Sequence, residues 1–181
     1  MRLTASMLAC VALGLAACDS GQVPPPGQSR DVVPTQQLAG DEVLLRGQGL
    51  VAGVEAFYFA AGKTEVEAAL ERTLGDPVAS GDMSECGAGP MQFSSYPGGL
   101  SVNFQDGNLV GWTLAAEDPS ISVIGEVQVG SSESDARNAD GFTQLPETSL
   151  GEEFTIGPRI GGLLKDGEVA MLYAGNQCFF R

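Results

Sequence analysis

Two matching β-hairpin signals, about sixty residues apart, constrain the fold of this chain more than any other feature of its sequence. In the first, apolar and polar residues alternate over residues 100–105 before the turn Asp106-Gly107. The second repeats the pattern around Asp166-Gly167, and each hairpin begins with Gly-Gly-Leu. An Asp-Gly pair between such segments predicts a type I′ turn, because both central residues need a positive φ. We therefore expect two similar antiparallel units.

The clearest helix signal covers residues 64–74. Thr64 is a suitable N-cap, and Glu67 completes a capping box three residues later. Gly75 and the following Pro77 predict the end of the helix. A weaker helical segment covers residues 133–139. The sequence thus predicts an α+β fold with two tandem helix-plus-antiparallel-sheet repeats, at about residues 41–118 and 119–181.

The hairpin register predicts which side chains share a face. A two-residue turn gives the pairs Phe104–Leu109, Val102–Gly111, Leu100–Thr113, Leu164–Val169 and Lys165–Glu168. The opposite face then holds Val110, Trp112, Leu163 and Leu172, and we expect it to bind a partner, since Trp is favoured at binding hot spots. Two alternatives stay open: the repeats pack against each other there, or Trp112 belongs to the core. A three-residue turn would also reverse the parity.

The first eighteen residues predict a bacterial lipoprotein signal. Arg2 precedes an apolar stretch over residues 3–15, which is too short to span a bilayer that needs about 20 helical residues. The leader ends in Leu15-Ala16-Ala17-Cys18, which resembles the lipobox, where the Cys is lipid-modified before cleavage. We expect residues 1–17 to be removed and Cys18 to anchor the chain to the envelope, on the periplasmic side. The alternative is an ordinary secretory signal cleaved near Ala17.

Residues 18–40 are expected to form a disordered tether between the lipid and the folded region. This segment contains four Pro together with Gln and Ser, and it has too little apolar surface to offset its ordering entropy. Asp19 resembles the signal that retains lipoproteins in the inner membrane of enteric bacteria. The inner membrane is therefore favoured, and the outer membrane stays open as the alternative.

Two of the four Cys remain available for structure once Cys10 leaves with the leader and Cys18 is lipidated. Because the envelope is oxidising, we predict a disulfide between Cys86 and Cys178. Closing a loop of nearly a hundred residues is worth about 4–5 kcal/mol in the chain-entropy model. A metal site is the alternative, but two Cys without His supply too few soft ligands.

Composition excludes several classes of function. The chain has 23 Asp and Glu, 9 Lys and Arg and no His, with a formal net charge of -14. The lack of His excludes a Ser-His-Asp triad, and the acidity disfavours nucleic acid, which needs Lys and Arg. The carboxylates are expected in turns and on polar faces, without the apolar pocket that a general acid needs. We therefore expect no enzyme and no catalytic residues.

Three short motifs resemble ligand sites, and each has a simpler explanation. Gly62-Lys63-Thr64 resembles a phosphate-binding loop, but Phe57 stands where that loop needs Gly. Residues 47–52 resemble a dinucleotide loop, but a strand rather than a helix is predicted to follow. A Ca²⁺ loop over residues 136–147 would begin with Ala136, which offers no oxygen ligand. No cofactor and no metal site are expected.

The repeated pattern resembles envelope lipoproteins of the SmpA/OmlA type and the tandem arrangement of the β-lactamase inhibitor protein. The residues that carry this resemblance are Gly62, Thr64, Leu74, Gly75, Pro77, Gly99, Leu100, Asp106 and Gly107. It implies a short helical segment on one face of an antiparallel sheet in each half. Each half of the chain has a single convincing helix, whereas each half usually has two in the family. The whole chain also resembles a class of bacterial lipoproteins with a Cys-Gly-x-Gly segment and a terminal Cys-x-x-Arg, which implies no known activity.

These features together favour a non-enzymatic envelope lipoprotein that binds a protein partner through its sheet. The membrane is contacted through the lipid on Cys18, and no nucleic acid is expected as a partner. The alternative function is a periplasmic inhibitor or a small-ligand-binding protein, by analogy with the inhibitor fold.

Overall fold

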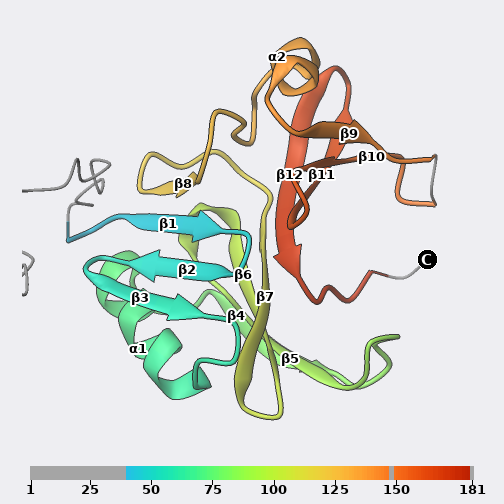
Figure 1. The fold of residues 1–181 in the computed structure, drawn as a ribbon. Coiled ribbons are helices and arrows are strands. Elements are labelled where there is room, and N and C mark those ends of the chain that lie inside the picture. The colour runs from blue at the N-terminus through green and yellow to red at the C-terminus, as the bar shows by residue number, and fades with distance from the viewer. Residues whose placement is uncertain (1–39, 147–148, 180–181) are drawn as a thin grey trace, which may run out of the picture. The chain divides into compact units, whose positions relative to one another are not determined.

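The structure is a computed structural model that describes residues 40–146 and 149–179. The predicted leader, the lipidation site Cys18, Asp19 and nearly all of the tether lie outside the described residues. The described residues belong to one compact unit. Figure 1 shows how its helices and strands are arranged.

Two sheets and two helices make up this unit, which confirms the predicted α+β class. A four-stranded sheet has the order β3-β2-β1-β8, and its strands are β1 (Val43–Arg46), β2 (Gly49–Ala52), β3 (Glu55–Tyr58) and β8 (Ile121–Val123). Strands β1 to β3 are antiparallel, and β8 is parallel to β1.

The larger sheet has eight antiparallel strands in the order β4-β5-β6-β7-β12-β11-β10-β9. Each half of this sheet therefore begins at an edge strand, β4 or β9. The last strands of the two halves, β7 and β12, pair at the centre. One half of this sheet consists of β4 (Ala79–Met83), β5 (Met91–Ser95), β6 (Leu100–Gln105) and β7 (Asn108–Leu114), with a 3-10 turn at Pro97–Gly99. The other is built from β9 (Phe142–Gln144), β10 (Glu152–Ile156), β11 (Ile160–Lys165) and β12 (Glu168–Gly175).

Helix α1 (Lys63–Leu74) lies close to the predicted range, but it begins differently. Gly62 is the N-cap and makes no side-chain cap bond, so the predicted Thr64 cap and its capping box are wrong. Glu67 instead accepts a hydrogen bond from the Ser94 hydroxyl at 2.6 Å. The predicted stop is confirmed, because Gly75 has a φ of 87° and its N–H bonds the carbonyl oxygen of Glu71.

Helix α2 (Glu133–Asn138) is a short helix, with Ser132 as its cap. The Ser132 hydroxyl accepts the backbone N–H of Asp135 at 3.1 Å. The buried Ala136 faces the sheet, and the Arg137 guanidinium lies 5.6 Å from the Phe142 ring centre. Phe142 shares the face of the sheet that holds Trp112, so both helices cover the same side.

Both Asp-Gly turns form as predicted, with positive φ at Asp106, Gly107, Asp166 and Gly167. The pairs Phe104–Leu109, Leu164–Val169 and Lys165–Glu168 are confirmed. The other pairs of the first hairpin are wrong, because a β-bulge inserts Val110 as an extra residue. Val102 therefore faces Trp112 rather than Gly111, and Leu100 faces Leu114 rather than Thr113.

This shift places Trp112 in the core. Its side chain is fully buried, and its indole N–H donates to the backbone carbonyl oxygen of Arg46 in β1 at 2.8 Å. The four-stranded sheet therefore covers the same side of the large sheet as the two helices. The predicted placement of Trp112 and Leu172 on an exposed face is corrected, because both side chains are completely buried.

Candidate functional site: the outer face of the eight-stranded sheet

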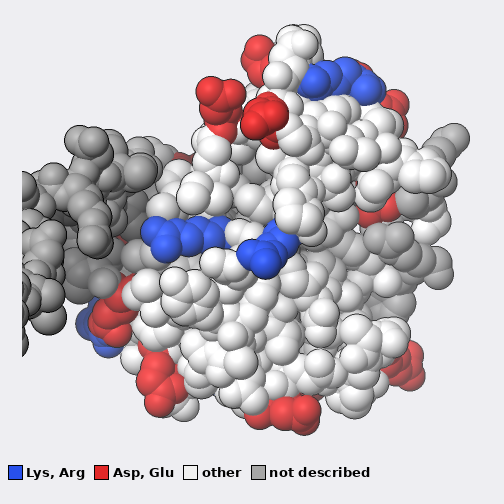
Figure 2. Space-filling view, in the orientation of Figure 1, with Lys and Arg blue, Asp and Glu red and all other residues white. Residues whose placement is uncertain are grey.

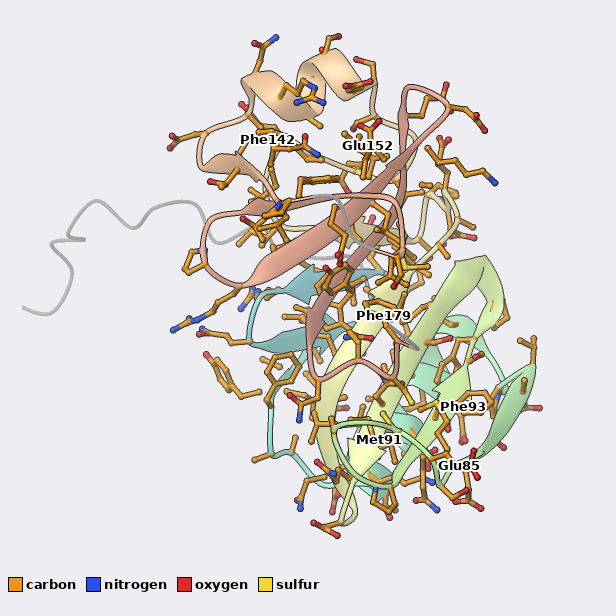
Figure 3. The ribbon with its side chains drawn as sticks, turned by 90° about the vertical axis from the view of Figure 1, so that its right-hand side faces the viewer. Glu85, Met91, Phe93, Phe142, Glu152 and Phe179 are labelled. Atoms are coloured by element: carbon orange, nitrogen blue, oxygen red, sulfur yellow. The ribbon has the colours of Figure 1, made fainter. Side chains whose placement is uncertain are left out.

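The face of the large sheet that points away from the helices and the four-stranded sheet is called the outer face here. Figure 3 turns the molecule so that the right-hand side of Figure 1 faces the viewer, and it labels Phe93 and Phe179 there. The described residues that cross this face are the 84–90 loop and residues 176–179, which we call the C-terminal strap.

A row of small and hydroxyl-bearing residues runs across the outer face from one edge to the other. The register aligns one residue from each strand: Thr143, Thr155, Gly161, Tyr173, Thr113, Ser101, Ser95 and Ala79. The Ser95 and Ser101 hydroxyls lie 2.7 Å apart, and the Tyr173 hydroxyl donates to a Glu153 carboxylate oxygen at 3.0 Å. The row gives this face hydrogen-bonding groups without charge.

Apolar side chains flank the hydroxyl row on both sides. Phe93 lies on the β5 side, and Leu163 and Met171 form a cross-strand pair on the β11–β12 side. Each is half-buried. Together with Met83, Ser101 and Phe179, Phe93 lines a groove of about 270 Å³. A groove of this kind can receive an apolar side chain and also bond its neighbouring backbone.

The charge of the outer face differs from that of the whole chain. Among the outer-face residues named above, Glu153 is the charged one, and it is fully buried. The chain as a whole has 23 acidic residues. Figure 2, in the orientation of Figure 1, shows Asp and Glu side chains spread over the top, the left, the bottom and the right-hand edge of the molecule. Depletion of charge with retained aromatic side chains is typical of the centre of a protein interface.

The C-terminal strap is fixed to the outer face by the side-chain amide of Gln177. Its oxygen accepts hydrogen bonds from the Asn103 amide at 3.1 Å and the Thr113 hydroxyl at 2.7 Å. Its nitrogen donates to the carbonyl oxygens of Trp112 at 3.0 Å and Ala174 at 2.8 Å. All four hydrogen-bonding positions of the amide are therefore used.

The two Cys for which the sequence predicts a disulfide lie together at this strap, as thiols. Cys86 is buried in the 84–90 loop, and its sulfur lies 4.0 Å from the Gln177 carbonyl oxygen. Burial, hydrogen bonding to Cys86 and the charge of Cys86 raise the pKa of Cys178 to about 11. The pair is not bonded in this structure, so the disulfide stays a prediction.

The sequence-predicted partner residues are separated by the fold. Leu163 lies on the outer face, whereas Trp112 and Leu172 lie in the core and Val110 is the half-buried bulge residue. Sequence reasoning missed Gln177 and Phe179, and the signal available was a polar Asn-Gln pair shortly after the second predicted hairpin.

A second hollow lies on the inner side, between β8 and the strands near α2. Its volume is about 220 Å³, and its lining includes Val123, Val127, Ile156, Ile160 and Leu172. Glu126 and Asp140 also line it. This arrangement suits a small apolar ligand.

Over residues 40–146 and 149–179, no group of three or more acidic or Cys side chains is placed to hold a metal ion. None of the helices described there is long and apolar enough to cross a membrane.

No protein-family model, curated protein or solved structure matches the chain. The resemblance to SmpA/OmlA-type lipoproteins and to the β-lactamase inhibitor protein therefore stays a prediction from sequence.

Proposed function

We propose that this chain is a lipid-anchored protein of the bacterial cell envelope that binds another protein through its outer face and catalyses no reaction. One observation carries the proposal: a groove-bearing sheet face, lined by a hydroxyl row and half-buried apolar side chains, on a chain with a net charge of -14. The net charge of -14 favours a partner with basic residues, because opposite charges speed encounter.

The order of elements supports a tandem-repeat origin. Helix α1 is followed by β4 to β7, and α2 is followed by β9 to β12. In each set, the last two strands form an Asp-Gly hairpin, and the two final strands pair at the centre of the sheet. We propose that these sets are two repeats arranged as in the β-lactamase inhibitor protein.

The location of the protein in the envelope depends on the N-terminal leader. The lipobox Leu15-Ala16-Ala17-Cys18 supports lipid anchoring at Cys18, and Asp19 favours the inner membrane over the outer one. A tether of residues 18–40 would let the folded unit reach a partner at some distance from the membrane.

Small-ligand binding is the second candidate function. The apolar hollow of about 220 Å³ between β8 and β10–β12 favours it. Of the described residues that line this hollow, the charged ones, Glu126 and Asp140, are exposed. Ligand sites usually combine an apolar lining with a few convergent polar groups. The outer face is therefore the better-supported site.

Replacing Phe93 with Ala tests the proposed face. Phe93 lines the groove, so Phe93→Ala should reduce partner recovery in crosslinking and pull-down from the native envelope by about tenfold or more, which is typical of an aromatic hot spot. Tyr58→Ala is the matched control, because Tyr58 is 58% exposed on the four-stranded sheet. Equal recovery with Phe93→Ala and the wild type, at unchanged thermal stability, would remove this face from the account.

A further inference from the structure

The sheet is shaped to receive the C-terminal strap. A Cβ atom at Gly111 would lie 2.3 Å from the backbone oxygen of Asn176 and 2.9 Å from the Gln177 amide nitrogen. Gly175 turns the chain onto the face with a φ of 75°, and the Asn176 N–H then bonds the Val110 carbonyl oxygen at 2.8 Å. These positions leave room for the strap where any other residue would obstruct it.

Beyond Gln177, the strap has two further contacts. The Phe179 ring packs edge-on against Tyr173, with ring centres 5.0 Å apart. The Cys178 thiol lies beside Cys86, whose loop also covers Gln105 through a hydrogen bond to Ala88. The strap thus joins the centre of the sheet to the β4–β5 loop, and it forms one wall of the groove beside Phe93.

We propose that the strap is a redox-controlled wall of the outer face, held closed by a Cys86–Cys178 disulfide and able to open when both are thiols. A donor disulfide, of the oxidised-glutathione class, supplies the oxidising equivalents. The Cys86 and Cys178 sulfurs form one S–S bond, the S–S bond of the donor breaks, and the two protons pass to the donor as two thiols.

Opening the strap would change the outer face in two ways. The Asn103 amide, which is 6% exposed, and the Thr113 hydroxyl would lose their Gln177 partner and turn to solvent. The groove beside Phe93 would lose the wall formed by Cys178 and Phe179. The closed form is therefore the partner-binding form, a consequence that rests on the proposed function. The structure holds the strap closed with both Cys as thiols, and the disulfide would fix it in that position. The strap itself can be tested without any partner.

Thermodynamic linkage provides the test. The closed strap holds the two thiols together, so a substitution that lowers the fraction of dithiol chains with a closed strap lowers the equilibrium constant for disulfide formation by the same factor. Gln177→Met keeps the length of the side chain and removes its four hydrogen bonds. In glutathione redox buffers, with the thiol and disulfide forms of the full folded chain quantified by mass spectrometry, this constant should fall about tenfold or more.

Gln92→Met is the matched control, because it makes the same substitution on the helix-covered side, where Gln92 contacts Lys63 and Asp82. It should leave the constant unchanged.

If Gln177→Met does not fold, Thr113→Val removes one donor to Gln177 and should lower the constant several-fold. Hydrogen exchange of residues 176–179 should be faster in the dithiol form than in the disulfide form. Failure of the disulfide to form, or one constant shared by the wild type, Gln177→Met and Thr113→Val, would overturn the proposal.

Discussion

Tyr96 shows how a single buried group shapes stability. Its side chain is buried, and its hydroxyl has no hydrogen-bond partner among the described residues. Burial, together with the nearby charges of Glu67 and Glu71, raises the pKa of Tyr96, so the phenol stays neutral. Removing an unsatisfied buried hydroxyl relieves a desolvation cost, so Tyr96→Phe should raise the free energy of unfolding by about 1 kcal/mol.

Urea unfolding of the two proteins measures this difference. Tyr58→Phe is the control, because Tyr58 is largely exposed and its hydroxyl is free to contact water. It should change the free energy of unfolding by less than about 0.5 kcal/mol. A lower free energy of unfolding in Tyr96→Phe would contradict this, because it would mean that the Tyr96 hydroxyl makes a stabilising hydrogen bond.

At the scale of elements, the sequence predicted what local chemistry determines. Asp106-Gly107 and Asp166-Gly167 specify their turns, because Asp and Gly readily adopt the positive φ that both central positions need. The bulge at Val110 was not predictable, because it serves a distant contact: it turns Trp112 inward, where the indole bonds Arg46 of another sheet.

The candidate site was predicted in part for the same reason. Leu163 was placed on the correct outward face by alternation within its own hairpin. The strap was missed because Gln177 bonds four residues from three strands, Asn103, Trp112, Thr113 and Ala174, which are adjacent only after the sheet has formed. Periodicity does not record contacts over such sequence separations.

At the scale of the whole molecule, Cys18 determines where the outer face can act. If Cys18 is lipidated, Cys18→Ser should leave the precursor uncleaved or shift the protein from the membrane to the soluble fraction, because the acyl chains supply the membrane affinity. Fractionation and intact-mass analysis of the membrane-extracted wild type are the measurements. An unmodified Cys18 in membrane-extracted protein would contradict the anchor and leave the secretory-signal alternative.

The central claim is that the outer face binds a protein, and site-specific photo-crosslinking in the native envelope tests it most directly. A photoreactive amino acid is placed at Phe93 on β5 or at Thr155 on β10, two outer-face positions on opposite sides of the β7–β12 pair. Val54 in the β2–β3 turn and Tyr58 in β3, which are 88% and 58% exposed, serve as controls. The account predicts one discrete adduct of the same partner from Phe93 and Thr155 and none from Val54 or Tyr58. Adducts from the control positions alone, or none from the outer face, would contradict it.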